Sequence, residues 1–186
     1  MRIIAGSLRG RSLSAPRGWA TRPTSDRVRE ALFSILGDVA DLEVLDLYAG
    51  SGALGLEALS RGARSAVFVE EAREALAALE RNLTELGVAG AARVLPGGVC
   101  SALRRLGQIG QRFGLVFLDP PYESPLTSEV TAELARGDVL AEGAWVVLEH
   151  AARTDPPAGG GRLALRFTSV YGDTALTFYR YSSEAP

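Results

Sequence analysis

The residues with the clearest chemistry in this sequence are Asp119, Pro120, Pro121 and Tyr122, which follow the apolar run 114–118. Proline lacks a backbone N–H and holds the residue before it extended, so this tetrapeptide ends a buried strand and leaves hydrogen-bond acceptors at its tip. The Asp119 carboxylate and the Pro120 carbonyl can accept both N–H bonds of an exocyclic amine, while Tyr122 stacks on the ring. The segment predicts a site that positions a nucleobase amino group, although alone it would also fit an ordinary strand exit.

A second candidate site is the glycine-rich stretch 50–55, which follows an apolar run ending near Asp46. Its glycines permit a tight turn and a close approach of a ligand to the backbone, and the helix that begins there offers unpaired N–H groups. A phosphate loop would look similar, but the lysine of a Walker loop is missing and Asp46 would place a negative charge beside phosphates. A cofactor with a cationic amino group fits better. The candidate cofactor contacts are Asp46, Tyr48, Gly50, Ser51 and Gly52.

Glu70 ends the next apolar run, twenty residues after Gly50. From this position an acid can accept both hydroxyls of a ribose. The spacing alone is weak evidence, because Glu70 and Glu71 would also suit the start of a helix, where acids are favoured. Together with the glycine-rich stretch, it favours a ribose-containing cofactor.

The elements that must position these residues alternate between short apolar strands and amphipathic helices. Nearly apolar strands separated by helices predict a parallel sheet covered on both faces. When the order of such a sheet reverses beside strand one, strands one and four are neighbours and ligands bind outside their carboxyl ends. Gly50 and Asp119 should therefore face one crevice. We expect strands at 43–49, 65–70, 91–95, 114–119 and 144–150, and helices at 52–62, 71–87, 99–107 and 126–137.

The carboxyl end of the chain departs from this alternation. After the loop 154–161, two β-rich runs at 162–171 and 174–181 flank Gly172 and Asp173, which predicts a tight hairpin. An α/β sheet closed by an antiparallel hairpin resembles the S-adenosylmethionine (SAM) dependent methyltransferases. The resemblance implies an α/β, Rossmann-like class I fold with a mostly parallel seven-stranded sheet in the order 3-2-1-4-5-7-6.

The amino-terminal region is basic. Residues 1–29 contain seven arginines and one acid, whereas residues 30–186 contain 13 arginines and 21 acids. A basic extension on an acidic body suggests contact with a polyanion, and nucleic acid is the commonest candidate; a solvated charged extension is the alternative. We expect a small hairpin around residues 7–10. The expected domains are a basic hairpin extension at 1–25 and a methyltransferase domain at 26–186.

A helix is expected over 26–36, with Thr24 or Ser25 as its N-cap. In this helix Arg27 and Arg29 are expected to point away from the buried face. The residues assigned to that face are Val28, Leu32, Ile35 and Leu36.

Composition narrows the class of protein. A chain of 186 residues that is 47% hydrophobic predicts one globular domain with an appendage. The single Cys100 allows no internal disulfide and favours a reduced, cytoplasmic setting, and the single His150 leaves no histidine cluster for a metal. Both are expected to be structural, with Cys100 in the core. No apolar run approaches the roughly 18 residues that a membrane span requires, so a soluble protein is expected.

Taken together, the motifs resemble the RsmD family, the bacterial 16S ribosomal RNA guanine-N2 methyltransferases. The resemblance rests on "RIIAGSLRGRSL", "RPTSDRVREALFSIL", "DLYAGSGALGLEALSRG", "FLDPPY" and "YGDTALTFY", and it spans nearly the whole chain. The glycine-rich and DPPY motifs occur in many amino methyltransferases, including DNA adenine enzymes, so they specify only the reaction class. The two amino-terminal motifs supply the specificity.

The resemblance implies SAM as cofactor without a metal, and 16S rRNA as partner, free or within a 30S particle or assembly intermediate. It implies that the cofactor contacts named above and Glu70 bind SAM and that the protein acts as a monomer. Gly97 and Gly98 depart from the acidic or amide residue of many relatives and can offer only backbone to the adenine. The resemblance places Asp119, Pro120, Pro121 and Tyr122 on the guanine, Arg22 and Thr24 near the cofactor or base, and Arg9, Arg11, Arg27 and Arg29 on RNA phosphates.

Two other functions remain open. A DNA adenine-N6 methyltransferase could share the same tetrapeptide, and an RNA-binding or assembly module could retain the fold without catalysis. The sequence shows no separate target-recognition domain, which counts against the first. Intact Asp119 and an intact glycine-rich stretch count against the second.

Overall fold

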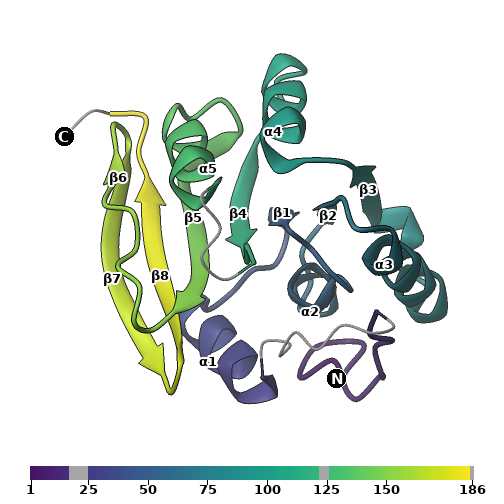
Figure 1. Ribbon diagram of the computed structural model, residues 1–186. Helices are drawn as coiled ribbons and strands as arrows, with labels where there is room; N and C mark the ends of the chain where they lie inside the picture. Colours follow the sequence, from purple (N-terminus) through teal and green to yellow (C-terminus); the bar gives the residue numbers. More distant parts are fainter. Residues whose placement is uncertain (17–24, 122–125, 185–186) are drawn as a thin grey trace. The chain divides into compact units, whose positions relative to one another are not determined.

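The computed structural model describes residues 1–16, 25–121 and 126–184 of an α/β chain with an eight-stranded sheet in the order β3-β2-β1-β4-β5-β8-β7-β6 (Figure 1). The fold class is confirmed: the predicted sixth and seventh strands are β7 and β8. The additional strand, β6, is two residues long. The chain divides into two compact units, Met1–Gly97 (unit 1) and Gly98–Pro186 (unit 2).

Unit 1 is built on three parallel strands, of which β1 and β2 are buried on both faces and β3 is partly exposed. Leu45 of β1 pairs with Val67 of β2, and Phe68 of β2 pairs with Val94 of β3. Helix α2 packs against β1 and β2. The elements are α1 (Asp26–Leu36), β1 (Glu43–Leu47), α2 (Ala53–Ser60), β2 (Ser65–Glu70), α3 (Arg73–Leu86), the 3-10 turn η1 (Ala89–Ala91) and β3 (Ala92–Pro96).

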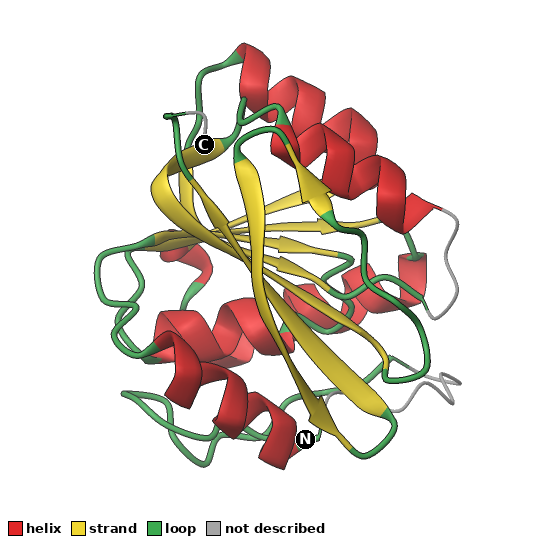
Figure 2. Ribbon diagram, turned by 90° about the vertical axis from the view of Figure 1, so that its left-hand side faces the viewer, coloured by secondary structure: helices red, strands yellow, loops and turns green. Residues whose placement is uncertain are grey.

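Unit 2 contains one parallel strand pair, β4 with β5, and an antiparallel set formed by β5, β8, β7 and β6. Figure 2 draws the long strands of this set in yellow. The predicted hairpin is confirmed, since β7 and β8 pair up to Tyr171 and Thr174 around Gly172, whose φ is 63°. The elements are α4 (Val99–Gln108), β4 (Phe113–Leu118), α5 (Leu126–Ala135), β5 (Leu140–Ala151), β6 (Gly159–Gly160), β7 (Leu163–Tyr171) and β8 (Thr174–Tyr181).

The first residues of the chain turn back on themselves as expected. Arg2 and Ser12 form an antiparallel bridge, Ile3 donates its N–H to the Arg11 carbonyl at 2.9 Å, and Gly10 donates to the Ile3 carbonyl at 2.9 Å. Residues 1–14, here called the arm, bury Ile3 and Leu13 within unit 1. The predicted domain boundary at residue 25 stays a prediction.

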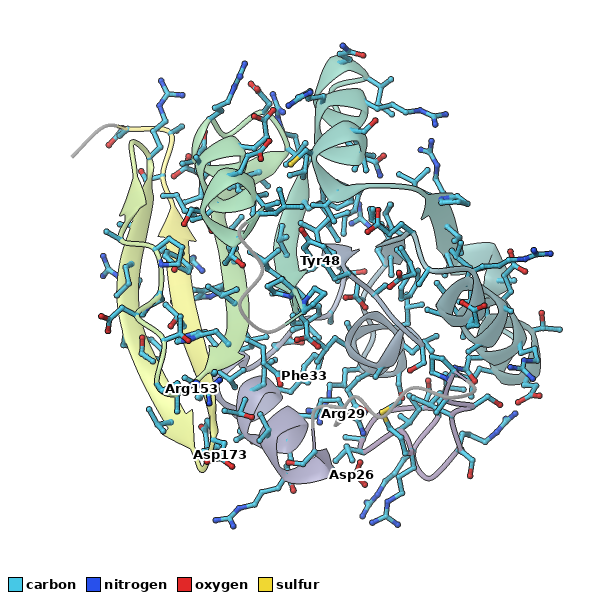
Figure 3. The ribbon with its side chains drawn as sticks, in the orientation of Figure 1. Asp26, Arg29, Phe33, Tyr48, Arg153 and Asp173 are labelled. Atoms are coloured by element: carbon cyan, nitrogen blue, oxygen red, sulfur yellow. The ribbon has the colours of Figure 1, made fainter. Side chains whose placement is uncertain are left out.

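Helix α1 corrects one prediction. Ser25 is its N-cap, with Oγ accepting from the Val28 N–H at 3.2 Å, as predicted. The predicted outward direction of Arg29 is wrong, because its side chain is fully buried, and Ile35 is 39% exposed. Arg29 Nη2 donates to Asp26 Oδ1 at 3.0 Å and to the Arg2 carbonyl, so a neighbouring acid and a backbone acceptor stabilise the buried cation (Figure 3). The buried face of α1 consists of Val28, Arg29, Leu32 and Phe33.

Within the described part of the chain, no helix combines the length and the apolar character that crossing a membrane would require. Cys100, predicted to lie in the core, is half-buried at the start of α4.

Gly55 is expected to be sensitive to the addition of a single methyl group. A Cβ at this position would lie 2.3 Å from Cε1 of the fully buried Phe68 ring and 3.1 Å from Asp46 Oδ2. We expect Gly55→Ala to lower the free energy of unfolding by about 1 to 3 kcal/mol, because the ring must move within a packed core. Urea unfolding measures the change. Gly90→Ala is the control, since a Cβ there meets nothing within 4 Å, and an equal loss in both variants would contradict the packing argument.

Candidate functional site

The turn between β1 and α2 contains the predicted glycine motif, and residues 50–52 are here called the glycine loop. Gly50 and Gly52 both adopt left-handed backbone conformations, with φ of 57° and 83°. A Cβ on Gly52 would lie 2.5 Å from Leu79 Cδ1, whereas a Cβ on Gly50 would meet nothing within 4 Å. Packing therefore leaves no room for a side chain at Gly52, whereas the backbone at Gly50 borders open space that a ligand can approach. Because the N-cap of α2 is Gly52, the cap residue itself has no side chain that could accept from the first turn of this helix.

Glu70 lies beside the glycine loop at the carboxyl end of β2. Its side chain is 7% exposed, and Oε2 accepts from the Gly50 N–H at 2.8 Å. Oε1 accepts from the N–H groups of Glu71 and Ala72, each at 2.8 Å. Three backbone donors thus surround one carboxylate, which stabilises its charge and ties the loop after β1 to the turn after β2. Sequence spacing predicted that Glu70 would lie near the glycine loop, but not that it would hold the loop.

Asp46 lies near the end of β1 and is 1% exposed. Its Oδ2 accepts from the Gly55 N–H at 2.9 Å and so fixes the first turn of α2. The pKa of Asp46 is raised from 3.8 to about 8, chiefly by burial. The Gly55 hydrogen bond opposes this rise, and the nearby Glu70 charge makes a smaller contribution in the same direction as burial. Asp46 is a buried support for the first turn of α2.

The raised pKa of Asp46 predicts a pH dependence of stability. The folded protein retains a proton on Asp46 between pH values near 4 and near 8, where the unfolded chain has lost it, so stability falls as the pH rises through this range. We expect Asp46→Asn to remove a decline of roughly 3 kcal/mol in the free energy of unfolding between pH 5 and pH 8. Urea unfolding across that range measures it. Asp41→Asn, an exposed change at φ of 60°, should keep the wild-type slope; equal slopes in all three proteins would contradict the assignment.

Two further predicted contacts are Tyr48, which precedes the glycine loop, and Ser51, which lies within it. Tyr48 adopts a φ of 59°, a conformation that is uncommon for a residue with a side chain and is concentrated at functional sites (Figure 3). Ser51 is 7% exposed, and its carbonyl accepts from Asn82 Nδ2 at 2.9 Å. The sequence did not predict this role of Asn82.

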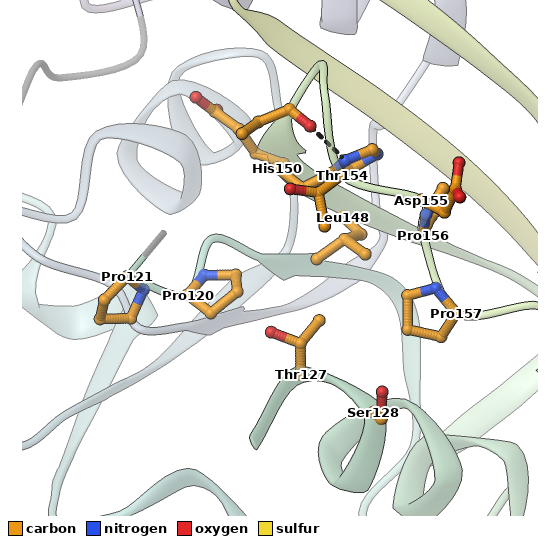
Figure 4. A pocket seen from close by; sticks show the side chains of 12 residues that line it. Pro120, Pro121, Thr127, Ser128, Leu148, His150, Thr154, Asp155, Pro156 and Pro157 are labelled. Atoms are coloured by element: carbon orange, nitrogen blue, oxygen red, sulfur yellow. Dashed lines mark hydrogen bonds between the residues drawn. The ribbon is translucent and has the colours of Figure 1, made fainter. Parts of the chain in front are cut away.

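In unit 2, the two prolines of the DPPY motif line a cavity of about 200 Å³ (Figure 4). Asp119 follows the end of β4 and is half-buried, while Tyr122 lies outside the described residues. The walls combine apolar groups with hydroxyl, carboxyl and imidazole groups, a composition that suits a small aromatic ligand with polar edges. The lining residues are Pro120, Pro121, Thr127, Ser128, Leu148, Glu149, His150, Ala151, Thr154, Asp155, Pro156 and Pro157.

His150 lines this cavity but has a partner at each ring nitrogen. Nδ1 lies 3.0 Å from the Ala151 carbonyl and Nε2 lies 2.8 Å from Thr177 Oγ1. Because a carbonyl oxygen only accepts, Nδ1 carries a proton, and Nε2 shares a hydrogen bond with the Thr177 hydroxyl. Thr177 Oγ1 in turn lies 2.8 Å from Thr168 Oγ1. These contacts support the structural role predicted for His150.

The arginines expected to contact RNA fall into two groups. Arg9, Arg11 and Arg27 are exposed, and Arg11 also donates to the Glu85 carbonyl. Arg29 is fully buried, so in this conformation it cannot reach a phosphate. Arg22 and Thr24 lie outside the described residues. Gly97 donates its N–H to the Glu70 carbonyl at 2.9 Å, a backbone contact where many relatives are expected to offer a side chain.

The structure brings Asp46, Gly50, Gly52 and Glu70 together in unit 1, and gathers Pro120 and Pro121 with the cavity in unit 2. That the two motifs face one crevice stays a prediction. Among the described residues there is no group of three or more His, Cys, Asp or Glu side chains that could hold a metal ion.

Known proteins are similar to this chain along its whole length. The family model described as "Conserved hypothetical protein 95" matches residues 1–180. Ribosomal RNA small subunit methyltransferase D of Escherichia coli K12 is 39% identical over 185 residues, which cover 99% of this chain and 91% of that protein. The solved structure of hypothetical protein TTHA0928 from Thermus thermophilus is 36% identical, with a TM-score of 0.82 over 96% of this chain and 98% of that one.

More distant structures share only the fold. One of them, SMU.776, was solved in complex with S-adenosylhomocysteine (SAH) and is 15% identical, with a TM-score of 0.66 over 83% of this chain and 48% of that one. The family match and the full-length identity carry more weight than this likeness. The chain belongs to the conserved hypothetical protein 95 family, which is the RsmD family that its motifs indicate.

Proposed function

We propose that this protein transfers the methyl group of SAM to the exocyclic N2 of a guanine in a hairpin loop of 16S ribosomal RNA. The observation that carries the proposal is 39% identity to a small subunit ribosomal RNA methyltransferase over 99% of this chain, with the glycine-rich and DPPY motifs both present. It acts as a monomer in the bacterial cytoplasm, on free 16S rRNA or on a 30S particle or assembly intermediate.

The residues of unit 1 fit the proposed cofactor. Gly50 leaves open space in which a ligand can approach the backbone, and the Glu70 carboxylate beside it can accept from ribose hydroxyls. Since Glu70 already accepts three backbone N–H bonds, ribose hydroxyls would share the carboxylate with the loop that it holds. SAM, when bound, supplies an electrophilic methyl group on a positively charged sulfur, which the negative charge of Glu70 would favour.

The DPPY segment would hold the target amine. Its lone pair is delocalised into the guanine ring, so the amine is a weak nucleophile. Acceptors at the Asp119 carboxylate and the Pro120 carbonyl would draw its two hydrogens to one side and turn the lone pair towards the methyl group. If the amine attacks the methyl group, so that an N–C bond forms as the S–C bond breaks and SAH leaves, the nitrogen would gain positive charge, which the Asp119 carboxylate would stabilise. Asp119 can then take the proton that the methylated amine releases.

The cavity beside Pro120 and Pro121 is the proposed site of the guanine ring. Prolines supply an apolar wall, and Thr127, Ser128 and Glu149 include both donors and acceptors for the polar edges of a base. A base in an RNA loop must leave its stack to enter such a cavity. The exposed Arg9, Arg11 and Arg27 would contact the RNA backbone, so binding should weaken as salt increases.

One experiment separates the candidate functions. The protein is incubated with methyl-labelled SAM and naked 16S RNA, partly assembled 30S particles or adenine-containing DNA, and the labelled nucleoside is identified. We expect N2-methylguanine in one of the RNA samples. Label in N6-methyladenine of DNA would establish the alternative DNA methyltransferase. SAM binding without transfer to any sample would point to a non-catalytic RNA-binding module.

A further inference from the structure

Asn82 connects two segments that lie far apart in the sequence. It is fully buried on α3, where its neighbours on the same helix face include Leu79 and Leu83. Its Nδ2 donates to the Ser14 carbonyl at 3.0 Å and to the Ser51 carbonyl at 2.9 Å, and its Oδ1 accepts from the Ser14 N–H at 2.8 Å. One side chain thus holds the end of the arm and the centre of the glycine loop.

The arm has a second attachment on α2, the helix that begins at the glycine loop. Glu57 is fully buried there and accepts from the Ile4 N–H at 2.7 Å and the Ala5 N–H at 3.0 Å. Ser60 Oγ donates to the Ala5 carbonyl at 2.6 Å and accepts from the Leu8 N–H at 3.0 Å. The arm contributes only backbone groups to these contacts. They therefore hold the arm in place without using its arginine side chains, which stay exposed to a partner.

We infer that Asn82 is a positioning residue that couples docking of the arm to the conformation of the glycine loop, so that RNA contact on the arm and cofactor binding in the loop favour each other. This inference rests on the proposed function and adds a regulation of the same site. Coupling of this kind is reciprocal: if a bound cofactor raises the equilibrium constant for arm docking by some factor, a docked arm raises the affinity for the cofactor by the same factor.

The energetic basis of this coupling is that the Asn82 amide group is buried and depends on its protein partners for hydrogen bonds. Three of its four hydrogen-bonding positions are filled, and two of these three bonds go to Ser14. If the arm leaves, the amide loses its Ser14 partners and is free to turn away from Ser51, so the loop carbonyl loses the group that fixes it. A docked arm therefore favours one loop conformation, and a bound cofactor that needs this conformation favours a docked arm.

The test uses hydrogen exchange of the full-length protein with SAH as the probe. In the wild type, SAH should slow exchange in the arm by at least about threefold relative to α4, a helix to which neither Asn82 nor the arm makes any of the hydrogen bonds described above. Asn82→Ala should abolish this protection, but it also leaves buried carbonyls unpaired and can impair folding. Ser14→Pro is therefore the main variant: it removes the Ser14 N–H and touches no atom of the glycine loop.

Ser14→Pro should weaken SAH binding about three- to tenfold, the value of one hydrogen bond to a buried partner, and should remove the protection of the arm by SAH. Ser7→Ala is the matched control, since it removes only the 3.3 Å bond from Ser7 Oγ to the Ser60 carbonyl and leaves Asn82 intact. Thermal unfolding checks that each variant is folded.

Each result separates the coupling from the proposed function. Normal SAH binding with no change in arm exchange in the wild type would overturn the coupling and leave the methyltransferase assignment standing. Equal weakening by Ser14→Pro and Ser7→Ala would also overturn it, because the effect would then belong to the arm as a whole. No SAH binding by the wild type would remove the proposed cofactor, and the coupling with it.

Discussion

Replacing Asp119 by alanine should lower kcat for methyl transfer by about a hundred- to a thousandfold while changing SAH affinity by less than about threefold. The carboxylate is the only charged side chain in the DPPY segment, and alanine leaves the Pro120 carbonyl as a single acceptor for two N–H bonds. The amine would then lose both its alignment and the negative charge that stabilises it as the N–C bond forms. Single-turnover transfer at saturating SAM measures the chemical step, and calorimetric titration with SAH measures affinity.

We expect the change to affect kcat and not SAH affinity, because Asp119 and the proposed cofactor contacts belong to different segments of the chain. Asp119 follows β4 in unit 2, whereas Gly50 and Glu70, which are proposed to contact the cofactor, belong to unit 1. Asp138→Ala is the control, because Asp138 is an acid of the same unit whose exposed carboxylate pairs with the exposed Arg136 at 3.3 Å. A loss of SAH affinity as large as the loss of kcat would mean that Asp119 contacts the cofactor.

The main strands and helices could be predicted from the sequence because apolar runs and the residues that end them indicate the same bounds. The apolar run 65–70 is a strand with the predicted bounds, and the predicted strand 114–119 is observed at Phe113–Leu118. Proline after this strand removes the donors that would continue it, so its end could be located from the sequence. The two-residue β6 was expected to be loop, since Gly159 and Gly160 lack the side chains that identify a strand and are assigned only by pairing with β7.

Residues of the candidate site could be predicted only where the residue type and its spacing from other motifs indicated the same role. Arg29 was expected at the surface because the apolar residues of the helix were assigned to another face. Asp26, one turn away, and the Arg2 carbonyl supply acceptors that no local pattern reveals. A role for Asn82 is only weakly indicated by the sequence, as it is a polar residue on the apolar face of α3. Its partners are at positions 14 and 51, and only the tertiary structure brings them together.

Glu70→Ala should weaken SAH binding by about a hundredfold or more, the value of two hydrogen bonds to a charged acceptor, while kcat at saturating SAM falls far less. The change removes the proposed ribose acceptor and also the group that holds the Gly50 N–H and the turn at Glu71 and Ala72. A loop without this support samples other conformations, which lowers affinity further. Calorimetric titration with SAH measures the effect.

Two further variants show which property of Glu70 matters. Glu71→Ala removes the neighbouring exposed acid and should leave SAH affinity within about twofold of wild type. Glu70→Gln keeps the size and one oxygen but brings an N–H₂ group to a site lined by N–H donors, so it should resemble Glu70→Ala more than wild type. If Glu71→Ala were equally harmful, general negative charge would explain binding. If Glu70→Ala lowered kcat and spared affinity, Glu70 would act in the chemical step, and the division of roles between Glu70 and Asp119 would be wrong.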